Sequence, residues 1–111
     1  MSITKDGFFD RGHITKPREV RLPDGESIFV RPLSGSGRDA FASAQQRGRE
    51  ELGTATLIAY CACDETGKLL FCKDDIERIS NMPVSLIGPI AEAIIEDAGL
   101  GANAVEEEVK N

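Results

Sequence analysis

The chain has 111 residues and a formal net charge of −6, and 41% of its residues are hydrophobic. Its length and hydrophobic fraction predict one domain with a core large enough to fold without metal or disulfide help. Residues 1–50 carry nine Lys/Arg and seven Asp/Glu (net +2), whereas residues 51–111 carry four and twelve (net −8), so phosphate repulsion argues against a nucleic-acid partner. No stretch approaches the ~20 apolar residues of a membrane span and the N-terminus lacks the apolar run of a signal peptide, so we expect a cytoplasmic protein with no membrane partner.

Residues 1–16 have a loop-like composition, because glycine and aspartate interrupt any apolar periodicity. We expect a flexible N-terminal arm here, since chain ends are often loosely held. Phe8 and Phe9 are its exceptions and are predicted to dock on the domain or on a partner. Residues 17–100 are expected to form the single globular domain, and residues 101–111 a disordered acidic tail.

Residues 18–32 show the pattern of a β-hairpin. Val20 and Leu22 alternate with polar residues, Pro-Asp-Gly-Glu (23–26) supplies a turn, and Ile28 and Val30 alternate again before Pro32. Two strands alone are marginally stable in water, so helices are expected to cover one face.

Two helices are predicted next. Ser34 or Ser36 is a candidate N-cap for a helix over about 37–47. Residues 51–63 are apolar almost all round, which predicts a helix that lies either at the buried centre of the domain or in the interface of a homo-oligomer. A strand over 56–62 is the competing interpretation, because short apolar runs are ambiguous.

The remaining segments predict a turn, a short extended piece and two helices. Residues 64–68 form the turn, residues 69–71 are extended, and a helix begins at Asp74 or Asp75 and ends near Asn81. Pro83 suits the first turn of the last helix, in which Pro89 either introduces a kink or marks where the regular part begins. Gly99 is the expected left-handed cap, with Leu100 packing back on the last turn. The fold class is therefore α+β: an N-terminal β-hairpin followed by a mainly α-helical bundle of about four helices.

No catalytic constellation is visible. The single histidine, His13, has no nucleophile partner in the sequence, and neither HExxH, GxSxG nor GxGxxG occurs. Cys61, Cys63 and Cys72 lack a fourth ligand at zinc-like spacing, so we expect small buried thiols and no metal or other cofactor. We therefore do not expect an enzyme.

Apolar residues recur at helical spacing in the last helix and are candidates for partner binding. Their alternative role is packing within the core. Together with the two N-terminal aromatics they form the predicted contact set: Phe8, Phe9, Leu86, Ile87, Ile90, Ile94 and Ile95.

The order of these segments resembles the small tail assembly chaperones of long-tailed, siphophage-type phages. The resemblance rests on the apolar TLIAYCACDE, the Asp-x-x-Gly turn followed by Leu-Leu-Phe, the helix start KDDIERI, and a last helix that begins with Met-Pro and ends with Ala-Gly-Leu. The upstream VRLPDGESIFVRPLSGSGRDAF also fits, so the resemblance covers roughly residues 17–100.

This resemblance implies a role in tail morphogenesis. Such chaperones bind the tape measure protein, keep it soluble, help recruit major tail tube subunits and are absent from the mature virion. Three other functions remain open: a small tail or head-completion protein retained in the virion, a small nucleic-acid-binding regulator, and a metal-binding module that uses the cysteines.

Overall fold

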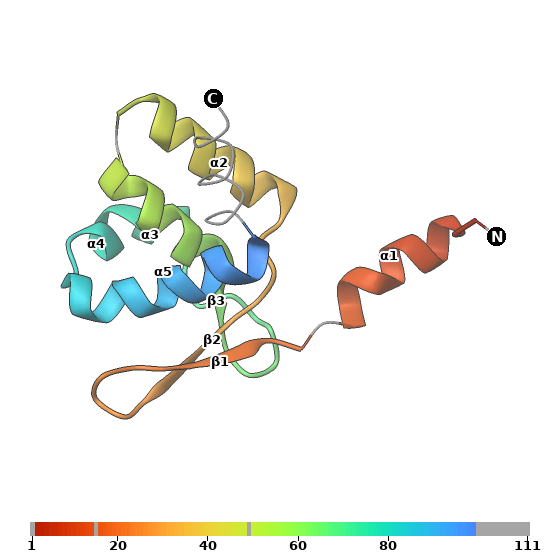
Figure 1. The fold of residues 1–111 in the computed structure, drawn as a ribbon, viewed down its shortest axis with the longest axis horizontal. Helices are drawn as coiled ribbons and strands as arrows, with labels where there is room; N and C mark the ends of the chain where they lie inside the picture. The colour runs from red at the N-terminus through yellow and green to blue at the C-terminus, as the bar shows by residue number, and fades with distance from the viewer. Residues whose placement is uncertain (1, 15, 49, 100–111) are drawn as a thin grey trace.

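The structure, a computed structural model, describes residues 2–14, 16–48 and 50–99. It contains a small antiparallel sheet and several helices, which confirms the predicted α+β class (Figure 1). In chain order the elements are α1 (Lys5–Ile14), β1 (Arg18–Arg21), β2 (Ser27–Val30), α2 (Gly35–Gln46), α3 (Glu50–Cys61), β3 (Ala62–Cys63), the 3₁₀ turn η1 (Lys73–Asp75), α4 (Ile76–Ser80) and α5 (Val84–Ala98).

Helix α3 lies at the centre of the domain and packs against α2, α4 and α5. Leu57, Ile58 and Cys61 are almost completely buried, and the Thr56 hydroxyl donates a hydrogen bond to the Leu52 carbonyl at 2.6 Å. The predicted buried central helix is therefore confirmed. The strand alternative for 56–62 is wrong, because the helix continues to Cys61.

Three antiparallel strands lie in the order β1-β2-β3. The predicted hairpin is confirmed, with Val20 opposite Ile28 and a turn in which Gly25 has a φ of 94°. Strand β3 was not predicted: residues 62–63 leave the helix and pair with β2, Val30 lying opposite Ala62. The helix over 51–63 therefore ends two residues early, because pairing with β2 satisfies the backbone groups of these residues.

Helices α2 and α3 approach closely at Gly37, in the first turn of α2. Ser34 is the N-cap of α2 and accepts a hydrogen bond from the Gly37 amide at 3.0 Å. A Cβ atom added at Gly37 would lie 2.7 Å from Leu33 Cδ1 and 3.1 Å from Tyr60 Cβ. The absence of a side chain at Gly37 therefore allows α2 to lie against the end of α3.

The C-terminal helices follow the predicted order with small changes. The helix expected from Asp74 or Asp75 is a 3₁₀ turn that continues into α4. Helix α5 begins directly after Pro83, so Pro89 lies inside the helix and does not mark its start. Gly99 caps α5 in the left-handed conformation with a φ of 72°. The predicted role of Leu100 and the predicted acidic tail 101–111 lie outside the described residues.

The loop-like prediction for the N-terminal residues is wrong over residues 5–14, which form α1. Thr4 supplies the local reason: its hydroxyl accepts a hydrogen bond from the Gly7 amide at 3.0 Å, as an N-cap residue does. This cap offsets part of the helix penalty of the glycines. Figure 1 shows α1 standing apart from the other elements. That this arm is flexible stays a prediction.

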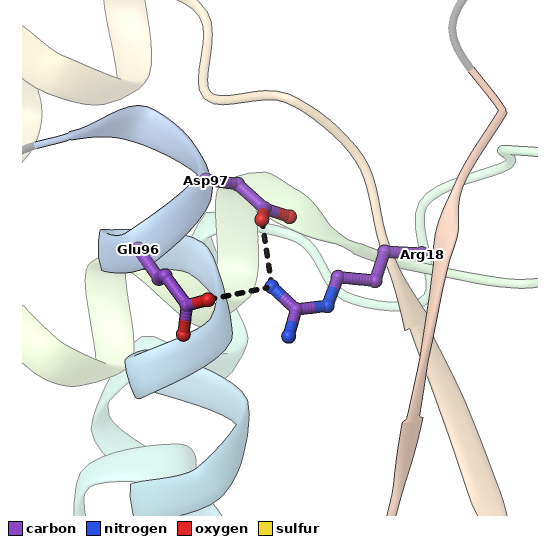
Figure 2. A network of polar contacts seen from close by, with 3 residues as sticks. All are labelled: Arg18, Glu96 and Asp97. Atoms are coloured by element: carbon purple, nitrogen blue, oxygen red, sulfur yellow. Dashed lines mark hydrogen bonds and ion pairs between the residues drawn. The ribbon is translucent and has the colours of Figure 1, made fainter.

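An ion pair joins the start of β1 to the end of α5 (Figure 2). The Arg18 guanidinium lies 2.7 Å from Asp97 Oδ1 and 3.9 Å from Glu96 Oε1. These side chains are partly exposed, so the pair contributes on the order of 1 kcal/mol or less. It marks where the arm leaves the domain, beside the C-terminal end of α5.

The two glycines at the start of α2 allow a matched test of the close approach. Gly37→Ala should lower the free energy of unfolding, because the new methyl group meets Tyr60 and Leu33. Gly35→Ala should leave it unchanged or raise it by up to about 1 kcal/mol, because a Cβ there meets nothing within 4 Å and alanine favours the helix. Urea unfolding of both variants measures the difference, and equal stabilities would contradict the close packing.

Candidate protein-binding groove

An apolar groove of about 580 Å³ opens between the hairpin, the loop after β3, α4 and the N-terminal half of α5. Its lining residues are Leu22, Ile28, Ile58, Leu70, Phe71, Asp75, Arg78, Ile79, Met82, Leu86, Ile87 and Ile90. Ten of these twelve side chains are apolar. The groove is therefore a surface for apolar contact and not a polar reaction site.

The floor of the groove belongs to the hydrophobic core. Ile58 of α3, Ile79 of α4 and Ile90 of α5 are all buried and pack together there. Since these residues are fixed by the folding of the domain, the shape of the floor is formed before any partner binds. Such preorganisation lowers the entropy cost of binding.

The rim of the groove exposes large apolar side chains to water. Leu70 is 50% exposed and Met82 is 45% exposed. Leu70 directly follows Leu69, which forms an isolated antiparallel β-bridge with Cys63. Met82 lies between α4 and Pro83. A contiguous apolar patch above a preformed apolar hollow is typical of a site for another protein.

The two charged residues of the groove are held at its edge by local contacts. The Asp75 carboxylate accepts a hydrogen bond from the Cys72 amide at 2.9 Å, which lowers the pKa of Asp75, and Arg78 lies 4.0 Å away. Asp75 is therefore a negatively charged helix-capping residue at neutral pH, and it is not placed to exchange protons with a ligand.

The cysteines do not form a reactive cluster. Burial raises the pKa of Cys61 to about 11, and burial also raises the pKa of Cys63. Both thiols are therefore protonated at neutral pH, and the prediction of small buried thiols is confirmed for them. It is wrong for Cys72, which is exposed because it lies in the loop just before the 3₁₀ turn. Within the described ranges, no three His, Cys, Asp or Glu side chains lie close enough together to hold a metal ion. None of the described helices is long and apolar enough to cross a membrane.

The similarity of this chain to known proteins lies in its fold. No protein-family model and no curated protein matches the sequence. A solved structure of the bacteriophage HK97 tail assembly chaperone is similar at a TM-score of 0.61 and 15% sequence identity, and the match covers 81% of this chain and 96% of that chain. The chain has the fold of the HK97 tail assembly chaperone. The predicted resemblance is therefore confirmed at the level of the fold.

On this tail-chaperone fold, the predicted contact residues of α5 separate into two groups. Leu86, Ile87 and Ile90 line the groove. Ile94 is 2% exposed and lies in the core, and Ile95 packs partly buried against the core without lining the groove. The burial of Ile94 follows from its position on the side of α5 that faces α3.

Phe8 and Phe9 lie on α1 and do not line the groove. Their rings pack edge to face with centroids 5.3 Å apart, and they remain 62% and 60% exposed. They face an open cleft of about 870 Å³ between α1 and the loops at 31–34 and 66–67. The structure therefore does not unite the two aromatic residues with the α5 residues in one site. Their partner-binding role stays a prediction.

Several groove residues were not predicted from the sequence. Leu22 and Ile28 were assigned only to the hairpin, and Leu70, Phe71 and Met82 were not assigned to a binding surface. One signal could have found the loop residues: Leu69, Leu70 and Phe71 are consecutive, and three successive extended residues cannot all face one core.

The different burial of the cysteines predicts their reactivity. Cys72 should react with an aromatic disulfide reagent within minutes at pH 8, whereas Cys61 and Cys63 should react only when the protein unfolds. Counting the released thiolate in native and denaturing buffer measures this. Cys72→Ser is the control and should show no fast phase. More than one fast thiol in the wild-type chain would contradict the described burial.

Proposed function

We propose that this chain is a phage tail assembly chaperone that binds an apolar helical segment of the tape measure protein in its groove. The groove carries the proposal, because it places exposed apolar side chains over a preformed hollow on the fold of the HK97 tail assembly chaperone. The proposed role is binding and not catalysis, and it places the protein in the host cytoplasm during assembly and outside the finished virion.

The chemistry of the groove defines the segment that it would accept. Amphipathic helices bind in grooves through apolar side chains spaced at i, i+3 or i+4, and i+7. The groove offers apolar contacts from five segments, namely the hairpin, α3, the loop after β3, α4 and α5, and it has charged groups only at its edge. A tape measure protein that forms a long helical rod would expose such apolar stripes along its length until tube subunits cover them.

The energetics favour binding of many copies to one long client. Leu70 and Met82 are each about half exposed, so covering them stabilises a complex by roughly 1 kcal/mol each. One groove would therefore bind weakly. Several grooves on one rod would gain affinity through effective concentration, and each could be displaced as tube subunits arrive. Weak and reversible contacts suit a protein that helps recruit tube subunits and then leaves.

Matched rim variants test the groove. Met82→Glu and Leu70→Glu should each reduce co-purification with the tape measure protein of the same phage by at least about tenfold, because a carboxylate would be desolvated in an apolar contact. Both side chains are half exposed, so the variants should fold. Co-expression, affinity capture of the chaperone and quantification of soluble tape measure protein measure the effect.

Val84→Glu provides the control. Val84 is 78% exposed, lies two residues from Met82 and does not line the groove, so this variant should keep wild-type capture. Equal loss in Val84→Glu, or no loss in either rim variant, would contradict binding in the groove. Failure of the wild-type chain to bind either tape measure or tube protein would overturn the proposed function.

The composition of purified virions distinguishes a chaperone from a structural tail or head-completion protein. The chaperone should be missing from the particles when they are analysed by mass spectrometry, while tape measure and tube proteins are present. Detection of this chain at a fixed number of copies per particle would favour the structural alternative.

A further inference from the structure

The proposed function leaves the open cleft of about 870 Å³ beside α1 without a role. This cleft and the groove share no lining residue, so they are separate surfaces. We propose that residues 105–109 of the same chain, Val-Glu-Glu-Glu-Val, dock in the cleft and hold α1 against the rest of the domain. The contact goes beyond the proposed tape measure binding, because it assigns a second site whose occupant belongs to the chain itself.

The lining of the cleft combines positive charge with apolar surface. Its charged residues are Arg11 of α1 and Arg31, which directly follows β2, and both are exposed. Among the described residues, no aspartate or glutamate lines the cleft. The apolar part of the lining consists of Ile3, Phe8, Phe9, Pro17, Pro32 and Leu33. A segment that carries carboxylates between apolar side chains matches both properties.

Arg31 is positioned for a carboxylate by a contact within the domain. Its Nη1 atom donates a hydrogen bond to the Gly67 carbonyl at 3.1 Å, which holds the guanidinium at the wall of the cleft. A guanidinium has five N–H donors, so this bond leaves others for carboxylate oxygens. Since Arg11 belongs to α1 and Arg31 to the domain, successive carboxylates that pair with both would connect the helix to the domain.

The two aromatic rings supply the apolar half of the contact. Phe8 and Phe9 pack edge to face with ring centroids 5.3 Å apart, and both remain more than half exposed. The aliphatic side chains of Val105 and Val109 would cover part of these rings, and the removal of apolar surface from water stabilises the docked state. The segment therefore gives the exposed aromatic pair a partner within the chain.

The C-terminal end of α5 leads towards the cleft. Figure 1 shows this end on the side of the domain that faces α1. It borders a smaller hollow of about 390 Å³, which is lined by Pro32, Leu33, Ser34, Gly35, Arg38, Asp97 and Ala98. Residues 32–34 also line the cleft, so the two hollows share one wall. Six extended residues span up to roughly 20 Å, so a linker over 100–105 can follow this wall from Gly99.

Charge and connectivity favour this occupant. Residues 100–111 carry three glutamates and one lysine, a net charge of −2, whereas the two hollows present Arg11, Arg31 and Arg38. The acid that lines the smaller hollow, Asp97, already lies 2.7 Å from Arg18. Exposed ion pairs are individually weak. A segment of the same chain is nevertheless present at an effective concentration of about millimolar, so weak contacts suffice to populate the docked state.

A spin label on the segment tests where it lies. The label is attached through Lys110→Cys in a Cys72→Ser background, since Cys61 and Cys63 are buried. The spin-labelled chain also carries isotopically labelled methyl groups, and it is diluted into an excess of chain with neither label. We expect stronger relaxation enhancement at the methyl groups of Ile3 and Leu33, which line the cleft, than at those of Leu22 and Ile28, which line the groove.

Neutral variants of the segment test the role of its charge. Changing Glu106, Glu107 and Glu108 together to glutamine should reduce the enhancement at Ile3 and Leu33 by at least about threefold, because the ion pairs with the arginines are lost. Trypsin should also cleave after Arg11 faster in this variant, since α1 is released from the domain. The control changes Glu26, Glu77 and Glu92 to glutamine. These residues are exposed, do not line the cleft and alter the net charge equally, so both readouts should stay at their wild-type values.

Three results would overturn the docked segment: no enhancement at Ile3 and Leu33, equal enhancement in the neutral variant and the wild type, or equal loss in the control variant. Strong enhancement when the spin label and the isotopic label are on different copies would also overturn it, because the segment would then occupy the cleft of another chain. Capture of the tape measure protein depends on the groove, so it is measured separately, and a failure here leaves the proposed function standing.

Discussion

Helix α3 is the constraint on which the rest of the structure depends. Its apolar residues face in almost every direction, so the helix is stable only when other elements enclose it. Helices α2, α4 and α5 pack against it from different sides, and its C-terminal continuation, β3, joins the hairpin. The positions of the other elements are therefore consequences of enclosing one segment of twelve residues.

This enclosure also produces the groove. Helix α5 is apolar over a wide face, and the part that contains Ile87, Ile90 and Ile94 is buried in the core that α3 centres. Towards its N-terminus, Ile87 and Ile90 are buried in the same core, whereas Leu86 is only partly buried and Leu70 and Met82 beside it are about half exposed. The same burial that stabilises the fold therefore leaves one apolar surface that the chain cannot cover by itself.

Much of the fold was predictable because its signals are local. The alternation around residues 23–26, the serine cap before α2, the acidic start of the 3₁₀ turn and the glycine that ends α5 each depend on a few neighbouring residues. Strand β3 was not predictable, because two residues become a strand only when β2 lies beside them. Helix α1 was missed because the glycine and aspartate content of the arm indicated a loop, while the cap at Thr4, which offsets part of the glycine penalty, was not considered.

The candidate site was predictable only in part, because local sequence signals do not show which segments come together in the fold. Helical spacing identified Leu86, Ile87 and Ile90, but spacing alone does not say which side of a stripe faces α3, so Ile94 and Ile95 were included with them. The contributions of the hairpin and of the loop after β3 come from segments far apart in the sequence. A groove that five separate segments line has no signature in any one of them.

The contact between Arg18 and Asp97 has a consequence for the order of folding. It joins positions 79 residues apart, and closing a loop of that length costs entropy that local contacts avoid. The contact therefore forms after α3 has gathered the helices, when the two ends of the domain are already close. An interaction that is made late slows unfolding without speeding folding, so the whole contribution of this exposed ion pair, about 1 kcal/mol or less, lowers the unfolding rate and raises the equilibrium stability by the same amount.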